Sequence, residues 1–318
     1  MGNVKEKRHW LILCGCTILN FAAIGIIINT LGLYFNPIIE DMGYSRTAVS
    51  MLVTILTFVN MLVMFFIGKL YKKYSAKRLI LIFGLIAGVA YAMYSRCNTI
   101  NQFYICAALV GLGVGGSSVV PASILVTRWF NEKRGFALGI AFSGSGLGGM
   151  VFAPISTKLI YTFGYKTAFL VQGISIIILF VLAYFIIENS PEDIGLKPYG
   201  YKKVDEEENT NKKLENYGLS FKEARKKPYF YGLMITGLII GITNLGTLTQ
   251  IPSFLIMNGY SENFVALVIT LYNVTLIFGK LAYGFINDKI GTYKGNVYVI
   301  SLWIAAIAVL PFAANMRL

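Results

Sequence analysis

The sequence predicts an all-α integral membrane protein. Only 14% of its 318 residues are charged and 56% are hydrophobic, whereas about 25% of the residues in soluble globular proteins are charged. The apolar residues gather in runs of about 20, the length that an α-helix needs to cross the hydrocarbon core of a bilayer. A soluble protein of this composition would expose very large apolar patches to water, so we exclude a soluble fold.

The apolar runs predict about nine transmembrane helices. They cover residues 10–35, 47–68, 79–97, 102–127, 135–160, 165–187, 229–257, 263–286 and 296–314. The first run follows a short basic stretch and is too long for the apolar core of a signal peptide. We therefore expect it to be retained as the first helix.

The Lys and Arg residues indicate the orientation in the membrane. If the N-terminus is cytoplasmic, the cytoplasmic segments hold 22 of the 28 Lys and Arg residues and the outer segments hold five. Cytoplasmic loops of membrane proteins carry such an excess of positive charge. We expect a multi-pass protein of the cell membrane with a cytoplasmic N-terminus. The net charge of +13 lies in short loops, so it does not indicate nucleic-acid binding.

The chain divides after the sixth run. Residues 188–227 are charged and lack apolar periodicity, which is typical of a solvated linker. We expect residues 1–187 to form a six-helix bundle, 188–227 a cytoplasmic linker and 228–318 a partial second bundle of three helices. Repeated halves are a recurring design of transporters, so this order indicates a six-plus-six plan that lacks its last helices.

Two related turns support an internal duplication. Residues 68–78, after the second run, read GKLYKKYSAKR, and residues 284–294, after the eighth, read GFINDKIGTYK. Each has a glycine at a helix end followed by a tight basic turn, and the two turns lie six helices apart.

The second turn resembles the signature of the major facilitator superfamily, Gly-x-x-x-Asp-x-x-Gly followed by basic residues, through Gly284, Asp288 and Gly291. In the first turn Gly68 is kept, but Lys72 replaces the acid. The resemblance implies the superfamily fold, a central substrate site between two halves, and transport by alternating access. It also implies that the acid latches the halves on the cytoplasmic side. The family's last three helices have no counterpart, so we expect a C-terminally truncated form.

Three further stretches are similar to the monocarboxylate transporter and oxalate:formate antiporter group of that superfamily. They are residues 35–46, at the exit from the first helix, residues 128–148, which include RWFNEKRG and the start of the fifth helix, and residues 190–198, SPEDIGLKP. The resemblance implies transport of small mono- or dicarboxylates such as oxalate, formate, lactate or pyruvate.

Lys280 is the candidate substrate-binding cation. A lysine well inside an apolar run costs about 2.5–3.5 kcal/mol on membrane-insertion scales and marks a functional site by default. It lies four residues before Gly284, where the resembled group has an arginine that binds the substrate carboxylate. Lysine keeps the charge but loses the planar fork of the guanidinium. The alternative is a side chain that extends along the helix to the interface.

Other polar residues of the predicted spans are candidates to complete the pocket, since a carboxylate beside one cation needs hydrogen-bond donors around it. They are Asn29, Tyr34, Asn244, Gln250, Tyr272 and Asn273. We expect Tyr34 and Asn273 to be the principal pair. The alternative for each is a contact between helices.

Conformational change is the second role that the sequence assigns. The candidate gating residues are Gly68, Arg128, Arg134, Gly284, Asp288 and Gly291. Glycines at 111, 113, 115 and 116 in the fourth run, and at 139, 144, 146, 148 and 149 in the fifth, predict close helix contacts. Static packing is the alternative for the glycines, and anchoring at the cytoplasmic interface is the alternative for the two arginines.

None of the 15 acidic residues lies inside a predicted span, and a proton-coupled transporter needs an intramembrane group to carry the proton. We therefore favour anion exchange or facilitated diffusion over proton symport. A truncated remnant that does not transport, or a membrane sensor or receptor of the same fold, is the alternative function.

Enzymatic chemistry is not indicated. The single histidine, His9, precedes the first run, and Gly111–Gly116 nominally matches a dinucleotide motif but follows no strand. We expect neither a metal site nor a cofactor. The four cysteines lie in or beside apolar runs, so they predict packing residues and not a disulfide framework.

Overall fold

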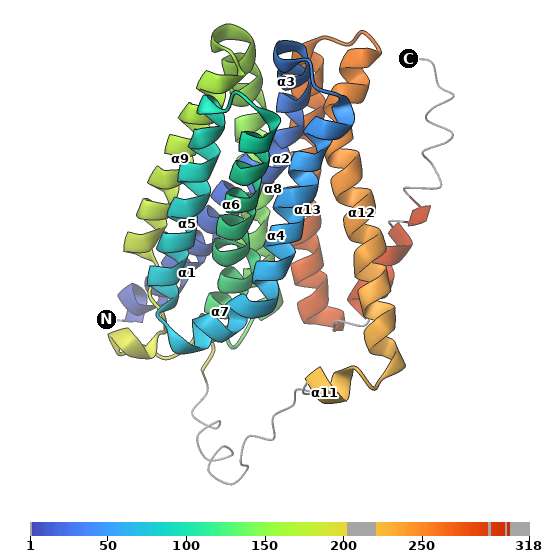
Figure 1. Cartoon of the computed structure of the whole chain (residues 1–318). Coiled ribbons are helices and arrows are strands. Elements are labelled where there is room, and N and C mark those ends of the chain that lie inside the picture. The colour runs from blue at the N-terminus through green and yellow to red at the C-terminus, as the bar shows by residue number, and fades with distance from the viewer. Residues whose placement is uncertain (1, 202–220, 292–293, 303, 306–318) are drawn as a thin grey trace.

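The computed structural model describes residues 2–201, 221–291, 294–302 and 304–305. Over these residues the chain is a bundle of long helices that lie side by side (Figure 1). The N-terminus lies at the end of the bundle from which residues 188–201 lead away, which we call the linker end. The predicted all-α membrane fold is confirmed.

The first span is not one uniform helix. It consists of α1 (Gly2–Asn20), a π-helical turn η1 (Phe21–Ile26), α2 (Ile27–Thr30), a 3-10 turn η2 (Leu31–Tyr34) and α3 (Phe35–Met42). The chain then reverses at Gly43, whose φ of 69° suits a residue without a Cβ atom.

The remaining helices follow in an up-and-down order. They are α4 (Arg46–Lys73), α5 (Ala76–Met93) with η3 (Tyr94–Arg96), α6 (Ile100–Ser117), α7 (Val119–Trp129), α8 (Arg134–Phe163), α9 (Tyr165–Ile186), η4 (Glu192–Ile194), α11 (Phe221–Ala224), α12 (Pro228–Met257) and α13 (Glu262–Ile290). Residues 294–302 are also helical. Ser45 and Ser261 cap α4 and α13 with their side chains, each accepting a backbone N–H from the first helical turn.

Eight of the predicted spans correspond to described helices. Seven helices in the described ranges are long and apolar enough to cross a membrane, and the 30-residue α12 contains two further apolar segments, Pro228–Ile242 and Leu248–Met257. The predicted ninth span, 296–314, lies largely outside the described residues and stays a prediction.

The fourth span differs from its prediction. It was expected as one helix over 102–127, but α6 ends at Ser117 and α7 begins at Val119, with Ser118 at φ −109° and ψ −106° between them. Pro121 explains the interruption, because its ring clashes with the carbonyl of residue 117 and it has no N–H to donate.

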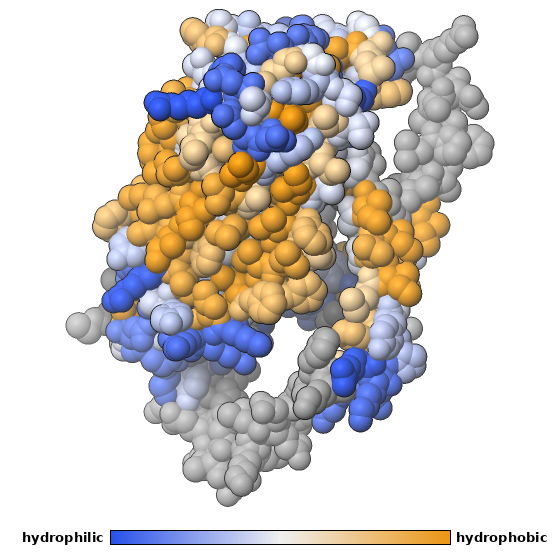
Figure 2. Space-filling model, viewed as in Figure 1, coloured by the Kyte–Doolittle hydropathy of each residue, from blue (hydrophilic) through white to orange (hydrophobic). Residues whose placement is uncertain are grey.

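An apolar band surrounds the middle of the molecule. Figure 2 shows this band between two hydrophilic ends on the face in view. Phe65, Phe66 and Phe185 are each more than 60% exposed. Side chains of this size face acyl chains and not water in a membrane protein.

Glycines hold the helices close together, as predicted. A Cβ on Gly113 of α6 would lie 2.5 Å from the Ala87 backbone nitrogen of α5, and one on Gly115 would lie 2.9 Å from the Asn60 carbonyl of α4. On α8, Gly148 lies against Gly25 of the π-helical turn. Without side chains at these positions the backbones approach to direct contact.

Candidate functional site

Lys280 lies on α13 at the face that packs against α8. Its ammonium donates to the Phe142 carbonyl at 3.1 Å and to the Ser145 hydroxyl. The two ion pairs between described residues both involve Glu188, and no described carboxylate lies within 4 Å of the Lys280 ammonium. An ammonium has three N–H groups, which leaves one for a ligand. The side chain is therefore a cation held between two helices by neutral acceptors.

Two asparagines extend this contact to the first span. The Asn29 amide donates to the Asn273 side-chain oxygen at 2.7 Å and to the Ser145 carbonyl at 3.0 Å. The Asn273 amide donates to the Ile269 carbonyl of its own helix at 2.8 Å. Asn29, Ser145, Asn273 and Lys280 thus form one hydrogen-bonded group across α2, α8 and α13, which we call the polar cluster.

The sequence allows this approach because α8 is rich in glycine where it meets α13. A Cβ on Gly146 would lie 2.7 Å from the Asn273 carbonyl, and one on Gly149 would overlap the Asn273 amide. A Cβ on Gly139 would lie 2.8 Å from the Lys280 carbonyl. Small residues at each turn of α8 therefore place the polar side chains of α13 within hydrogen-bond reach.

Tyr34 is not part of the polar cluster. Its ring stacks on Phe169 of α9, with centroids 4.0 Å apart, and its hydroxyl is fully buried without a described hydrogen bond. Phe169 also contacts Tyr91 and Tyr94. The expected pair of Tyr34 and Asn273 is not brought together in this conformation, because Tyr34 packs among aromatic rings of the first six helices.

The other predicted pocket residues lie in different places. Tyr272 is partly buried and packs against the apolar core. Gln250 accepts a hydrogen bond from Arg46 at 2.8 Å, which joins α12 to α4 at the end remote from the linker. The side chain of Asn244 lies outside the described residues.

Ser145 is the member of the cluster that the sequence did not single out as a site residue. It is 1% exposed, and it contacts Lys280 through its hydroxyl and Asn29 through its carbonyl. A serine within a glycine-rich helix could have indicated a polar contact at this position. The same residue is also typical of close helix packing, so it did not distinguish a site residue.

At the linker end, Asp288 binds the start of α8. Its two carboxylate oxygens accept from the backbone N–H groups of Gly135 and Phe136, each at 2.8 Å. These N–H groups have no intrahelical partner, and the helix dipole favours a negative charge there. Gly284 lies against the Gly135 carbonyl, where a Cβ would lie 2.5 Å away. The second signature turn therefore closes α13 onto α8.

Replacing Asp288 with asparagine should lower the stability of this contact. The amide keeps one acceptor but turns two N–H donors toward the N–H groups of α8, so we expect a loss of about 0.5–2 kcal/mol, the usual cost of a lost helix cap. A thermal shift of the purified protein in detergent measures it. Asp193→Asn, on an exposed turn, is the matched control, and equal melting of both variants would contradict the assignment.

The two candidate gating arginines contact backbone carbonyls near the linker end of the first six helices. Arg128 donates to the Asn189 carbonyl at 3.3 Å and Arg134 to the Phe130 carbonyl at 3.0 Å. Gly68 has open space around its Cα atom, and Gly291 ends α13 with φ 80°. Of the six candidate gating residues, Gly284 and Asp288 are the two on α13 that contact the start of α8.

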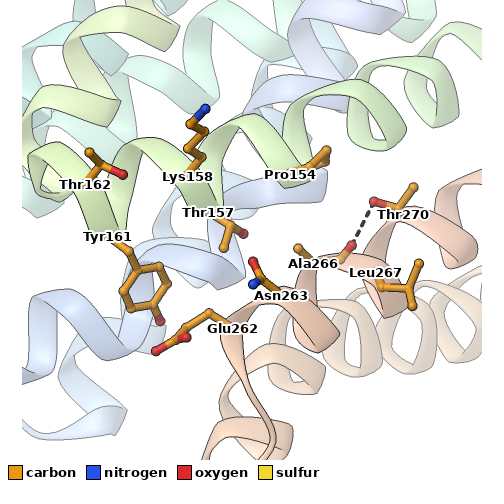
Figure 3. Close-up of a pocket in the computed structure, with 10 residues that line it drawn as sticks. All are labelled: Pro154, Thr157, Lys158, Tyr161, Thr162, Glu262, Asn263, Ala266, Leu267 and Thr270. Atoms are coloured by element: carbon orange, nitrogen blue, oxygen red, sulfur yellow. Dashed lines mark hydrogen bonds between the residues drawn. The ribbon is translucent and has the colours of Figure 1, made fainter.

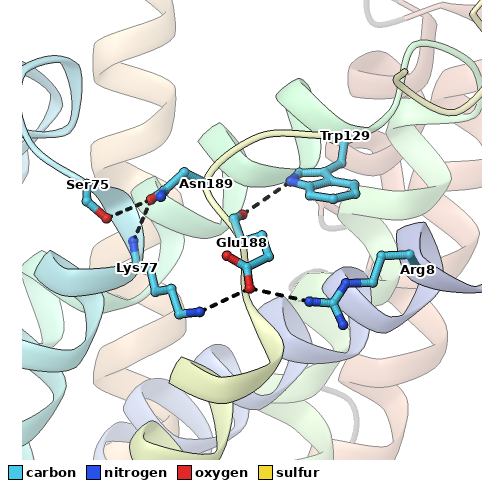
Figure 4. Close-up of polar contacts among 6 residues, drawn as sticks. All are labelled: Arg8, Ser75, Lys77, Trp129, Glu188 and Asn189. Carbon is cyan, nitrogen blue, oxygen red and sulfur yellow. Dashed lines mark hydrogen bonds and ion pairs between the residues drawn. The ribbon is translucent and has the colours of Figure 1, made fainter. Parts of the chain in front are cut away.

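Residues after α9 are fixed to the linker end of the first six helices. Glu188 pairs with Arg8 at 3.4 Å and with Lys77 at 3.1 Å (Figure 4). The Asn189 side-chain oxygen accepts from the Ser75 hydroxyl at 2.9 Å and from the Lys77 backbone at 3.0 Å. The chain therefore leaves the bundle from a defined point.

A groove of about 600 Å³ lies between α8 and α13 at the end remote from the linker. Thr157 and Tyr161 of α8 face Glu262 and Asn263 of α13 across it (Figure 3). Thr270 is also in its lining and precedes Asn273 by about one helical turn. A groove lined by both polar and apolar side chains thus runs between the same two helices at the end remote from the linker.

Comparison with known proteins decides the family. A model described as the Major Facilitator Superfamily matches residues 13–317. The chain belongs to this superfamily. The superfamily consists of membrane transporters, and no catalytic activity is indicated for this member.

Several known proteins are similar to this chain in sequence. The MFS-type transporter hasB of Aspergillus fumigatus is 27% identical over 96% of this chain and 66% of its own length. The aspyridones efflux protein apdF of Emericella nidulans is 24% identical over 90% of this chain and 55% of its own length. The oxalate:formate antiporter of Oxalobacter formigenes is 25% identical over 89% and 65%. The chain thus spans less than two thirds of the length of each of these relatives.

Two solved structures share the fold. A bacterial homologue of the human lysosomal transporter Spinster, in an inward-facing conformation, has a TM-score of 0.64 at 18% identity and covers 89% of this chain and 63% of its own. A D-xylose–proton symporter has a TM-score of 0.61 at 14% identity and covers 90% and 70%. At this identity the likeness concerns the fold alone.

Proposed function

We propose that this superfamily member is a secondary transporter of small organic anions, and that Lys280 binds the substrate carboxylate. One observation carries the proposal. Lys280 is a cation within a membrane span, at the contact between α8 and α13, and no described carboxylate lies within 4 Å of it. A permanent counter-ion would offset the cost of such a charge. In this proposal the substrate carboxylate is the counter-ion of the Lys280 ammonium.

The surroundings of Lys280 favour a small ligand. Two of its N–H groups are engaged by Phe142 and Ser145, so it offers one donor to one carboxylate oxygen. Asn29 and Asn273 lie in the same cluster and supply amide groups if their mutual hydrogen bond opens. Oxalate, formate, lactate and pyruvate each carry a carboxylate that can pair with one ammonium and accept hydrogen bonds from amide groups.

The closed and open ends of the α8–α13 contact support alternating access. Asp288 and Gly284 hold the helices together at the linker end, and the groove between them opens at the other end. Rocking of one half about the polar cluster would open the first and close the second. Such motion around a site at mid-membrane is how repeat-based transporters work.

Anion exchange or facilitated diffusion fits these helices better than proton symport. In the described spans, the acidic residues Glu40, Asp41, Glu262 and Asp288 all lie at helix ends. None of these is in the polar cluster. A proton carrier beside the substrate would require a titratable acid there.

The proposal includes the domain plan and the orientation. Residues 1–187 form the first half, 188–227 the cytoplasmic linker and 228–318 part of a second half. The excess of Lys and Arg at the linker end supports a cytoplasmic N-terminus in the plasma membrane. We propose a small carboxylate and the lipid bilayer as partners, with no nucleic acid and no cofactor.

Two other functions compete with anion transport. A remnant or a membrane sensor of the same fold would bind a ligand without moving it. The relative named as an aspyridones efflux protein favours a larger organic substrate. Transport assays separate these possibilities, because only an anion carrier accumulates labelled carboxylates.

Uptake into proteoliposomes tests the proposal. Vesicles that hold the full chain and are loaded with unlabelled oxalate or formate are diluted into the labelled anion, with empty vesicles as the control. We expect saturable counterflow of at least one short mono- or dicarboxylate, insensitive to a proton ionophore. Absence of counterflow for the whole panel, with the protein folded and inserted, would contradict anion transport.

A further inference from the structure

Two cysteines that are nine residues apart in the sequence come into contact in the fold. The Cys97 sulfur lies 3.8 Å from the Cys106 sulfur, and both side chains are nearly fully buried, at 3% and 4% exposure. No contact of this kind is described for Cys14 or Cys16 on α1. The sequence predicted four packing residues, and it did not show that this pair meets.

The connection between η3 and α6 sets this contact. Thr99 and Gln102 form a capping box at the start of α6, and the Gln102 side-chain oxygen also accepts from the Asn98 backbone at 2.8 Å. These bonds fold the connector back over the first turns of α6, on which Cys106 lies one turn beyond Gln102. The connector therefore places the Cys97 thiol beside the thiol of Cys106.

The separation suits a disulfide. A bonded pair of sulfur atoms is about 2.05 Å apart. The two sulfur atoms, now 3.8 Å apart, must therefore move closer together by about 1.75 Å. Rotation about the side-chain bonds of the two cysteines is the movement that would bring the sulfur atoms together, and Cys97 lies in a short connector between helices. Structural zinc sites need four ligands, and in the described ranges no group of three or more metal-ligating side chains occurs, so a metal does not compete for the pair.

We propose that Cys97 and Cys106 form a disulfide on the outer side of the membrane. The pair lies at the end of the bundle remote from the linker, which faces the oxidising compartment if the proposed orientation holds, and the inference rests on that orientation. Exported and periplasmic segments keep disulfides that the cytosol would reduce.

The reaction needs an oxidant of the disulfide class, either a small molecule such as oxidised glutathione or an exported thiol–disulfide oxidoreductase. During folding, before the helices bury the pair, one cysteine thiolate attacks a sulfur of that disulfide and releases one thiol. The second cysteine then attacks the mixed disulfide and releases the other thiol. Two electrons pass to the oxidant, which ends as two thiols, and the Cys97–Cys106 bond replaces two S–H bonds.

The bond would fix the outer rim of the first half. The first turns of α6 contact α4 and the residues just before it: the Ile100 N–H donates to the Tyr44 hydroxyl at 3.3 Å, and Tyr104 donates to the Ala48 carbonyl at 2.9 Å. A disulfide between the connector and α6 therefore stabilises the platform on which α4 and α6 meet.

Peptide mass spectrometry of the wild-type chain tests the proposal. Cells that express the full chain in a bacterial inner membrane are quenched with acid, and the denatured protein is alkylated with N-ethylmaleimide. Trypsin cleavage after Arg96 and Arg128 leaves both cysteines on one peptide. We expect this peptide without maleimide and lighter by two hydrogens, and with two maleimides after prior reduction with dithiothreitol.

The chain offers an internal control. Cys14 and Cys16 lie together on a second peptide, between Arg8 and Arg46, and should carry maleimide in both samples. Cys97→Ser should make Cys106 reactive. Two maleimides on the 97–128 peptide from unreduced membranes would overturn the proposal. Refolding of the denatured, purified protein in oxidised glutathione, which reaches the thiols before they are buried, then locates the error: closure there implicates the orientation, and its absence implicates the geometry.

Discussion

Replacing Lys280 with glutamine should reduce anion counterflow by about 100-fold or more. Glutamine has a similar length but no charge, so the substrate carboxylate loses its one charge-assisted hydrogen bond and is left unpaired in a medium where an unpaired charge is costly. Lys280→Arg restores the charge and should retain measurable transport. Initial rates of labelled formate and oxalate counterflow, taken over a range of concentrations, give the change in Vmax and KM for each variant.

The matched control is Lys226→Gln, an exposed lysine in the segment before α12. It removes the same charge from the protein and should leave transport unchanged. Thermal melting separates an effect on folding from one on binding. If Lys280→Gln is folded and transports as the wild type does, Lys280 serves only the contact between α13 and α8 and is not a substrate ligand.

Replacing Gly149 with leucine should abolish both transport and the folded state. A Cβ at this position overlaps the Asn273 amide, which is fully buried. Leucine adds three more carbons, so α13 must move away from α8 and the hydrogen bond between Asn29 and Asn273 must break. Overpacking that the backbone cannot absorb is among the most destabilising changes known. Size-exclusion chromatography in detergent should show loss of the monodisperse peak.

Gly279→Leu is the control for this variant. Gly279 lies on α13 with no atom within 4 Å of a Cβ built on it, so leucine there extends into open space. We expect a monodisperse protein with counterflow close to that of the wild type. Equal behaviour of the two leucine variants would show that the α8–α13 contact is not tightly packed.

Hydropathy and charge were sufficient to predict the helices, because the bilayer imposes a length and a composition on each span. The interruption at Ser118 required only attention to Pro121, whose backbone chemistry is local. The signature turn also placed Asp288 correctly at a helix boundary, although its partner at the start of α8 is 153 residues away. The sequence held no sign of which helix would receive it.

The composition of the polar cluster was less predictable. Asn29 and Asn273 are 244 residues apart, and nothing in a single sequence indicates that two such distant residues form a hydrogen bond. Each was a candidate ligand because it is polar in an apolar run, yet the same property suits a contact between helices. Tyr34 shows the limit most clearly, since an aromatic residue with a hydroxyl fits both a substrate pocket and the stack on Phe169.

The π-helical turn at Phe21–Ile26 determines which way the first span faces beyond it. A π-turn holds one residue more than an α-turn, and one residue corresponds to about 100° of rotation in an α-helix. A helical wheel drawn through residues 10–35 at uniform pitch therefore assigns Asn29 to the wrong side. The extra residue rotates the rest of the span about the helix axis, so that the Asn29 amide points toward Ser145 and Asn273. Deleting one residue from this turn would leave the span's length and hydropathy almost unchanged while rotating Asn29 out of register with its partners.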